Sequence, residues 1–362
     1  MRVLVVNAGS SSLKLRLLGP GDAVAAAHDL DRWTGDGGEL ASVVAGMAPS
    51  VEAVGHRVVH GGPELSAATV VNDAVLARIE ALTPLAPLHQ PRAAAAIRAV
   101  TTVLPDVPAV ACFDTAFHAS LPPAAATYAL PHEWTARWGL RRYGFHGLSH
   151  AYAARRAREM VSADETARTV TCHLGAGASL CAVQDGRSVD TTMGFTPLEG
   201  LVMATRSGSV DPGLVLWLVT DAGLGAAEVG RVLEGGSGLA GLSGTSGDVR
   251  EVLARVRGGD QSAVLALAVY VHRLRREIAA MVAALGGLDV LVFTGGVGEH
   301  SPPVRAAAAA GLGFLGVALD GAANDATTAD GEIGAPDAGA RTVVVTARED
   351  LEIARQTRAA LA

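Results

Sequence analysis

The sequence contains 362 residues, and at roughly 150 residues per domain this length corresponds to about two domains. Hydrophobic residues make up 49% of the chain and charged residues 18%, so a disordered or collagen-like chain is excluded. The formal net charge of −7 argues against a nucleic-acid partner, because phosphate-backbone binding requires a basic surface. Three cysteines are too few for a disulfide framework, and no apolar stretch is long enough for a signal-peptide core or a membrane span. We therefore expect a cytoplasmic protein with no membrane partner.

Lys14 is the only lysine among the 29 Lys and Arg residues of the chain. It follows a turn of small residues, 8–12, which comes directly after an apolar strand at residues 3–6. Lysine is a compact point charge, whereas arginine is a planar fork, so a site that needs a slim ammonium to reach a phosphate would retain lysine. We interpret Lys14 as a phosphate contact. The competing interpretation is a surface lysine left by chance.

Two stretches share one pattern of a strand, a turn of small residues and a second strand. In residues 3–17 the apolar side chains alternate after the turn, at Leu13, Leu15 and Leu17, which predicts a hairpin. In residues 169–183 the turn has the sequence GAGAS and is again flanked by apolar strands. The recurrence indicates either an internal duplication of the chain or the chance repetition of a common hairpin.

A third glycine cluster, residues 295–298, also follows an apolar strand, residues 291–294, and precedes a helix that opens with Pro302 and Pro303. Exposed backbone amides at such turns bind phosphate groups. None of the three turns is a Walker A motif, and each alone is weak evidence. Together they predict a nucleotide held from two sides.

The remaining pattern alternates helices with strands. Helices are predicted over residues 72–82, 91–103, 149–161, 213–222, 226–233, 248–257, 261–285, 302–310 and 349–361, and further strands over residues 51–59 and 109–113. This alternation is typical of an α/β protein with mixed sheets. Residues 19–49 carry no interpretable pattern.

Five segments place charged or imidazole side chains among glycine and apolar residues, which favours a cleft over a core. They are residues 55–62, 86–90, 113–118, 141–147 and 203–208. Any single His or Arg among them could instead have a hydrogen-bonded structural role. The chain has no HExxH motif, which argues against a zinc enzyme, and no GxSxG motif, which argues against a serine hydrolase.

Taken together, these segments resemble the acetate kinase family, part of the actin, Hsp70 and sugar-kinase superfamily of duplicated ATP-binding folds. The main resembling stretch is SVDTTMGFTPLEGLVMATRSGSVDP, residues 188–212. Further matching stretches follow the family's order at residues 7–14, 55–62, 86–89, 113–118, 141–150 and 171–175. The resemblance implies an α/β fold of two duplicated ribonuclease H-like, actin-like ATPase domains, with mixed sheets flanked by helices and an active site in the cleft between them. It implies one domain of residues 1–148 with 349–362 and a nucleotide-binding domain of residues 149–348.

The resemblance also implies an activity, namely the reversible, Mg²⁺-dependent transfer of the γ-phosphoryl group of ATP to acetate, giving acetyl phosphate and ADP. Mn²⁺ is an expected substitute for Mg²⁺, and a homodimer is the expected assembly. A propionate kinase is the closest competing function, because one methylene in an apolar pocket changes binding by only about 1–3 kcal/mol. An actin-like ATP switch would need no cationic acceptor pocket, and a sugar kinase would need a base for a neutral hydroxyl, so both are less favoured by these residues.

The catalytic positions of the family match Asp114, His146 and Arg206, where His146 corresponds to the transition-state stabiliser. Asp114 corresponds to a position usually described as a proton donor or acceptor. Because acetate is already ionised at pH 7, we expect Asp114 to orient an arginine or a Mg²⁺-bound water instead. By resemblance, the substrate-binding residues are Arg57, Val59, Leu88, His89, Phe145 and Pro197, and the metal-binding residues are Asn7 and Glu349.

The ATP-binding positions form the largest matching set. They are Ser10, Ser12, Lys14, His173, Leu174, Gly175, Ala176, Gly177, Asp248, Val249, Arg250, Gly296, Val297, Gly298, Glu299 and His300. Two of them depart from the family pattern, because Ala176 and His300 stand where asparagine is usual. The chain is also shorter than typical members, chiefly between residues 17 and 55 and after residue 310, which concerns peripheral elements.

Overall fold

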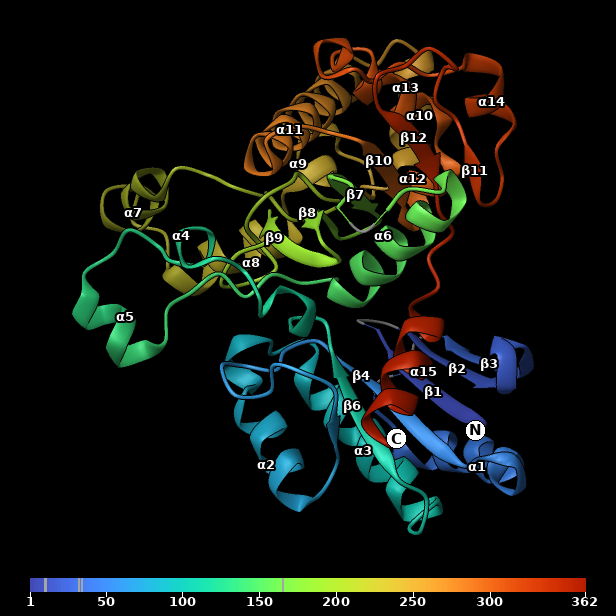
Figure 1. Cartoon of the computed structure of the whole chain (residues 1–362). Helices are drawn as coiled ribbons and strands as arrows, with labels where there is room; N and C mark the ends of the chain where they lie inside the picture. The colour runs from blue at the N-terminus through green and yellow to red at the C-terminus, as the bar shows by residue number, and fades with distance from the viewer. Residues whose placement is uncertain (10–11, 32, 34, 165) are drawn as a thin grey trace. The chain divides into compact units, whose positions relative to one another are not determined.

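The computed structural model describes residues 1–9, 12–31, 33, 35–164 and 166–362, which divide into two compact units (Figure 1). Unit 1 comprises Met1–Ala119, Phe145–Tyr152 and Arg348–Ala362. Unit 2 comprises Ser120–Gly144 and Ala153–Ala347. Helix α6, Gly147–Val161, therefore begins in unit 1 and ends in unit 2.

Unit 1 is built on a six-stranded mixed sheet with the order β3-β2-β1-β4-β6-β5. Its strands are β1 (Val3–Ala8), β2 (Ser12–Leu18), β3 (Val24–Asp31), β4 (Ala53–Val58), β5 (Thr69–Val70) and β6 (Ala109–Phe113). Strands β1, β4 and β6 run parallel, and β2, β3 and β5 pair antiparallel with their neighbours. The carboxyl ends of the three parallel strands therefore meet at one edge of the sheet.

Helices cover both faces of this sheet. Helices α1 (Gly37–Met47) and α3 (Gln90–Val103) pack on one face, where Leu4 and Val6 of β1 are buried, and α2 (Asp73–Ala81) packs against α3. The C-terminal helix α15 (Glu349–Ala360), red in Figure 1, lies on the other face, over Val3 and Val5. Because both faces are buried, β1 is a continuous apolar run rather than an alternating one.

Unit 2 repeats this architecture. Its strands are β7 (Thr169–Leu174), β8 (Ala178–Gln184), β9 (Arg187–Thr191), β10 (Val290–Thr294), β11 (Gly331–Glu332) and β12 (Arg341–Val344). They lie in the order β9-β8-β7-β10-β12-β11, with β7, β10 and β12 parallel and the others antiparallel. The strand order and the strand directions correspond, strand by strand, to β3-β2-β1-β4-β6-β5 in unit 1. The predicted internal duplication and the predicted mixed α/β fold are therefore confirmed.

In unit 2, the longest helix, α11 (Gln261–Leu285), packs on β8 and β9. Two short helices follow β10 directly, α12 (Gly295–His300) and α13 (Pro302–Ala309). The other helices of this unit are α4 (Pro123–Ala126), α5 (His132–Trp138), α7 (Pro212–Thr220), α8 (Ala226–Gly235), α9 (Gly238–Ser243), α10 (Val249–Arg257) and α14 (Gly321–Ala326).

Residues 120–144 belong to unit 2, whereas the expected boundary assigned them to the N-terminal domain. Polar contacts within unit 2 account for this. The Tyr128 hydroxyl donates to Glu199 at 2.6 Å, and Arg142 forms an ion pair with the same carboxylate at 2.9 Å. Arg142 also donates to the carbonyl of Met193 at 3.0 Å. These contacts connect the segment to the chain that follows β9.

Among the helices formed by the described residues, none combines the length and the hydrophobicity that crossing a membrane requires.

The close contact between β4 and α15 at Gly55 generates a stability prediction. A Cβ atom at this position would lie 2.6 Å from Ile353 Cγ2 and would also clash with Thr357 Oγ1. We expect Gly55→Ala to lower the free energy of unfolding by about 1–3 kcal/mol, because α15 must shift to accommodate the methyl group. Gly46→Ala near the end of α1 is the control, since nothing lies within 4 Å of its Cβ position, and it should stabilise by about 0.5–1 kcal/mol. Urea titration measures both values, and equal stability of the two variants would contradict the tight packing of α15.

Candidate active site

The strand ends of unit 1 bring together side chains that are far apart in sequence. Asn7 lies near the end of β1, Arg57 near the end of β4, and Asp114 directly after β6. The register pairs Val5 with Gly55 and Arg57 with Cys112. Because successive side chains alternate between the two faces of a sheet, Asn7, Arg57 and Asp114 all lie on the face that α15 covers. Since β2 runs antiparallel to β1, Lys14 lies directly opposite Asn7 at the same edge.

These strand ends form a hydrogen-bonded cluster around Arg57. Arg57 Nε lies 3.1 Å and 3.2 Å from the two carboxylate oxygens of Asp114, and Nη2 lies 2.6 Å from Asp114 Oδ2. Arg57 Nη1 donates to Asn7 Oδ1 at 3.2 Å, and Asn7 Nδ2 donates to Glu349 Oε2 at 2.9 Å. Glu349, the first residue of α15, also lies 3.9 Å from Arg57 Nη1. The cluster thus connects three strands and the C-terminal helix.

Burial has the largest effect on the pKa values of this cluster, because the Asp114 side chain is only 1% exposed. Burial raises the pKa of Asp114 above its ordinary value, and Arg57 opposes this rise. For Arg57, burial disfavours the charged form, but the carboxylates of Asp114 and Glu349 outweigh it and raise the pKa of the guanidinium. Arg57 is therefore permanently charged.

The donor set of this cluster fits Mg²⁺. One guanidinium and two carboxylates leave one net negative charge, and the oxygens of Asn7 and Glu349 are hard ligands of the kind that Mg²⁺ takes. Within the described ranges, no group of three or more His, Cys, Asp and Glu residues is arranged to hold a metal. Two protein oxygens suffice for a cation that keeps several waters.

A loop with unusual backbone geometry positions His146. His146 has φ 56°, in the left-handed region that non-glycine residues rarely occupy. The amide of the next residue, Gly147, donates to the carbonyl of Asp114 at 2.9 Å, and a Cβ at Gly147 would clash with that carbonyl. His118 Nε2 lies 3.0 Å from the carbonyl of Phe145. Strained residues of this kind cluster at functional sites, and here the strained residue is hydrogen-bonded through its neighbour to Asp114.

The other predicted residues of unit 1 have different environments. Val59 and Phe145 are buried, whereas Leu88 is 60% exposed. His89 is the N-cap residue of α3, and Ser12 is the first residue of β2. Ser10 lies outside the described residues. Sequence reasoning assigned no role to Gln90, a buried side chain that bonds both the amide and the carbonyl of His60 and so fixes the loop after Val59.

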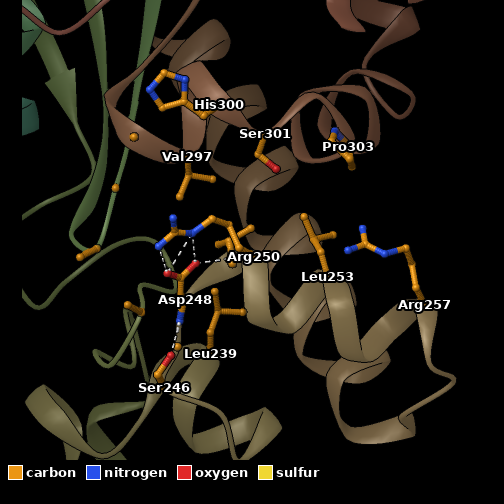
Figure 2. A pocket seen from close by; sticks show the side chains of 16 residues that line it. Leu239, Ser246, Asp248, Arg250, Leu253, Arg257, Val297, His300, Ser301 and Pro303 are labelled. Carbon is orange, nitrogen blue, oxygen red and sulfur yellow. Dashed lines mark hydrogen bonds and ion pairs between the residues drawn. The ribbon is translucent and has the colours of Figure 1, made fainter. Parts of the chain in front are cut away.

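Unit 2 contains a cavity of about 680 Å³ at the carboxyl ends of its parallel strands (Figure 2). Eight predicted nucleotide residues line it: Gly175, Ala176, Asp248, Val249, Arg250, Gly296, Val297 and His300. Five others, His173, Leu174, Gly177, Gly298 and Glu299, do not line it. Its volume suits a small-molecule ligand, and its position at strand ends is the usual one for α/β sheets.

The walls of the cavity combine glycine turns with apolar side chains. The turn after β7 supplies Gly175, and the start of α12 supplies Gly296. Leu239, Leu253 and Pro303 add apolar surface. Sequence reasoning missed these three residues, because no motif marks them. Backbone amides beside an apolar wall suit a ligand with a phosphate end and a flat aromatic end.

Arg250 and Asp248 form an ion pair on one wall of the cavity (Figure 2). Arg250 Nε lies 3.0 Å from Asp248 Oδ1, and the Arg250 side chain is 90% exposed. The hydrogen bonds from Arg250 hold the pKa of Asp248 below its ordinary value. Asp248 is also the N-cap residue of α10, so the helix start fixes its position.

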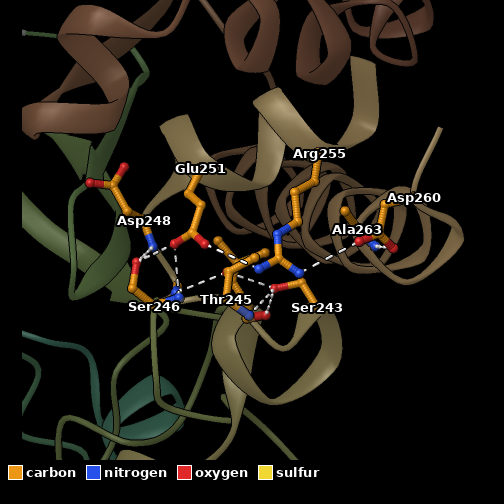
Figure 3. A network of polar contacts seen from close by, with 10 residues as sticks. Ser243, Thr245, Ser246, Asp248, Glu251, Arg255, Asp260 and Ala263 are labelled. Atoms are coloured by element: carbon orange, nitrogen blue, oxygen red, sulfur yellow. Dashed lines mark hydrogen bonds and ion pairs between the residues drawn. The ribbon is translucent and has the colours of Figure 1, made fainter. Parts of the chain in front are cut away.

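A polar network includes the loop next to Asp248 (Figure 3). The Ser246 hydroxyl donates to Glu251 at 2.7 Å, and the amide of Gly247 donates to Thr245 Oγ1 at 3.1 Å. Arg255 lies between two carboxylates, 3.4 Å from Glu251 and 3.6 Å from Asp260. These contacts fix the loop before α10, which carries cavity residues.

Arg206 and Pro197 contact each other in unit 2. Arg206 Nη1 donates to the carbonyl of Pro197 at 3.2 Å and lies 3.6 Å from Met203 Sδ. Burial lowers the pKa of Arg206, and Glu234 opposes this effect. Across the part of the chain that the structure describes, Arg206 forms no ion pair with a carboxylate, so its guanidinium can pair with an anionic ligand.

Comparison with known proteins gives one consistent result. Residues 39–355 match the model of the acetokinase family. The chain is 50% identical to an acetate kinase of Synechococcus sp. (strain JA-2-3B'a(2-13)), with 89% of this chain and 78% of the relative covered. It is 43% identical to an acetate kinase of Trichormus variabilis, with 98% of both chains covered.

Solved structures agree with these relatives. The crystal structure of Porphyromonas gingivalis acetate kinase matches with a TM-score of 0.92 and 35% identity over 100% of both chains. A propionate kinase from Francisella tularensis matches with a TM-score of 0.90 and 34% identity over 99% of both. A putative N-acetylmannosamine kinase from Listeria monocytogenes, 12% identical with a TM-score of 0.51 and full coverage of both chains, shares the fold alone.

Proposed function

Because the chain belongs to the acetokinase family, we propose that it transfers the γ-phosphoryl group of ATP to acetate. The reaction is reversible and gives acetyl phosphate and ADP. An acetate oxygen forms a bond to the γ-phosphorus while the bond to the bridging oxygen breaks, and ADP leaves with that oxygen and its electron pair. No proton has to be removed from the acceptor, since acetate is ionised at pH 7.

One observation carries the choice of a carboxylate acceptor. Asp114 is the buried carboxylate at the strand ends, and both of its oxygens are engaged by Arg57 at 2.6–3.2 Å. A kinase that phosphorylates a neutral hydroxyl needs a carboxylate free to accept a proton. An Asp114 side chain paired in this way suits an acceptor that needs no base. We propose that Asp114 orients Arg57.

The other proposed roles follow from charge. Phosphoryl transfer between two anions requires that their negative charge is neutralised and that the reacting groups are positioned. Guanidinium groups do both, because they bind carboxylate and phosphoryl oxygens through two parallel N–H donors. We assign these tasks to Arg57 and Arg206. His146 is proposed to donate to an equatorial oxygen of the transferring group, and its fixed backbone geometry supports this role.

For the metal, we propose that Asn7 and Glu349 hold Mg²⁺, with Mn²⁺ as a substitute. The metal would neutralise charge on the nucleotide phosphates. The contribution of this chain is to provide oxygen ligands whose positions are fixed by β1 and by the first turn of α15.

ATP and ADP are the nucleotide substrates of the family, and we propose that they occupy the cavity of unit 2. The eight predicted residues that line it support this assignment. Lys14, Ser10 and Ser12 are further proposed phosphate contacts. We also propose a cytoplasmic location, since the substrate ATP is found there and Cys112, Cys172 and Cys181 are not disulfide-bonded.

Propionate is the second candidate acceptor. The structural similarity to a propionate kinase favours it, and Val59, Leu88, Phe145 and Pro197, the residues proposed to contact the methyl group, are all apolar. A methylene in such a pocket is worth about 1–3 kcal/mol, so we expect propionate to be a slower substrate of the same enzyme.

A hydroxamate assay tests the proposed function. The protein is incubated with Mg·ATP and, separately, acetate, propionate, butyrate or glycerol, and acyl phosphate is trapped with hydroxylamine. We expect the strongest signal from acetate, a weaker one from propionate and none from glycerol. ATP turnover that is indifferent to every carboxylate would instead indicate an ATP switch and reject the acyl kinase.

Replacing Arg206 tests the anion-binding assignment. We expect Arg206→Ala to lower turnover with acetate by about 100- to 1,000-fold, because a preorganised cationic donor is lost, while the thermal midpoint changes little. Arg231→Ala on the exposed side of α8 is the matched control and should keep full turnover. Turnover of the Arg206 variant near the wild-type value would remove Arg206 from the mechanism.

We propose a homodimer in which α7 contributes to the interface. Its side chains Leu214, Leu216 and Trp217 are 46%, 64% and 54% exposed, and grouped apolar side chains of this kind mark association surfaces. We expect the wild type to sediment as a dimer and Leu216→Glu to shift the population to monomers. Phe314→Glu removes a more exposed but separate apolar side chain and should leave the dimer intact. A monomeric wild type would contradict the proposal.

A further inference from the structure

Arg305 is a charged residue in the interior of unit 2. It lies on α13, its exposed fraction is 0%, and it ranks among the largest fully buried side chains of the chain. No carboxylate of the described residues lies within ion-pair distance of it. A buried charge without a counter-charge is costly unless hydrogen bonds satisfy it. Arg305 therefore depends on its hydrogen-bond acceptors.

Four hydrogen bonds satisfy the guanidinium. Nη1 donates to the carbonyls of Gly298 and Glu299, at 2.9 Å and 2.7 Å. Nε donates to Asn324 Oδ1 at 2.8 Å, and Nη2 donates to the Asn324 carbonyl at 2.6 Å. Asn324 lies on α14, so Arg305 joins three consecutive helices, α12, α13 and α14, which are labelled in Figure 1.

The two carbonyls of α12 explain why an arginine is needed. Gly298 and Glu299 lie in the last turn of a six-residue helix, where carbonyls have no partner within the helix. A cation at the carboxyl end of a helix donates hydrogen bonds to the last carbonyls and interacts favourably with the negative end of the helix dipole. A helix this short has little stability of its own, so its position depends on such contacts.

The other side of α12 lines the cavity of unit 2. Gly296, Val297 and His300 line the cavity, whereas Gly298 and Glu299 do not. Glu299 also accepts a hydrogen bond from the amide of Ala347 at 3.0 Å. One side of α12 thus faces the cavity, and the other side is held by Arg305 and Ala347.

We propose that Arg305 is a positioning residue for the nucleotide. Its guanidinium fixes α12 in the orientation that presents Gly296 and Val297 to the cavity. The inference rests on the proposed function, in which this cavity holds ATP and ADP.

Arg275 provides a matched control within the same unit. It lies on α11, and its Nε donates to the carbonyls of Ala307 and Ala308 at 2.9 Å and 3.3 Å. These carbonyls end α13, and neither residue lines the cavity. Arg275 and Arg305 thus make the same kind of contact, but α13 contributes only Pro303, in its first turn, to the cavity lining, whereas α12 contributes Gly296, Val297 and His300.

The experiment compares Arg305→Met, Arg305→Lys and Arg275→Met. ADP affinity is measured by titration calorimetry, the KM values for ATP and acetate by steady-state kinetics, and folding stability by urea titration. We expect Arg305→Met to weaken ADP binding and raise the KM for ATP by about 10- to 100-fold, with the KM for acetate changed less than about twofold. Arg305→Lys should lie between wild type and Arg305→Met, because an ammonium reaches fewer acceptors.

The outcomes separate the inference from its premise. Arg275→Met should lose stability while keeping wild-type ADP affinity. A folded Arg305→Met with wild-type ADP affinity would overturn the inference, as would an Arg275→Met variant that weakens ADP equally. If Arg305→Met does not fold, a folded Arg305→Lys with unchanged ADP affinity also overturns it. A wild-type protein that binds no ADP would instead overturn the proposed function.

Discussion

The ion pair between Arg57 and Asp114 is the interaction on which the candidate site of unit 1 depends. A buried carboxylate and a buried guanidinium are each costly, and they are tolerated because three contacts of 2.6–3.2 Å join them and one further hydrogen bond extends from Arg57 to Asn7. The pair joins the ends of β4 and β6. Through the carbonyl of Asp114 it also connects to Gly147, and so to the strained backbone of His146.

The duplicated topology gives one chain two strand-end edges with different side chains. Each unit has three parallel strands whose carboxyl ends share an edge. In unit 1 this edge carries charged side chains, which suit an anion and its metal. In unit 2 the corresponding edge carries glycine turns and apolar walls, which suit phosphates and a flat ring. The fold supplies the same edge twice, and the residues at the strand ends decide its use.

How much the sequence could predict depended on the local signal. The long helix α11 and the hairpins with glycine turns have strong periodicity, and these elements occur where they were predicted. Strand β3 was missed because it lies at a sheet edge with mostly exposed side chains and lacks alternation. Helix α1 was missed because it contains three glycines, which weaken its helical pattern. In the candidate site, motifs predicted the glycine turns, but Leu239 and Leu253 follow no motif. Their place in the cavity depends on tertiary packing alone.

The arginines show why residue type alone does not predict a role, because every basic Lys or Arg residue of the chain except Lys14 is an arginine. Arg57 is paired with a carboxylate, Arg305 is satisfied by carbonyl and amide oxygens, and Arg206 has no carboxylate partner among the described residues. The three side chains are chemically identical, so their roles follow from their partners. Most donors of Arg57 and Arg305 are engaged by protein acceptors, which hold both guanidinium groups in place. Among the described residues, the guanidinium of Arg206 contacts one carbonyl, of Pro197, and one sulfur, of Met203, so more of its donors are open to an anion than those of Arg57 and Arg305.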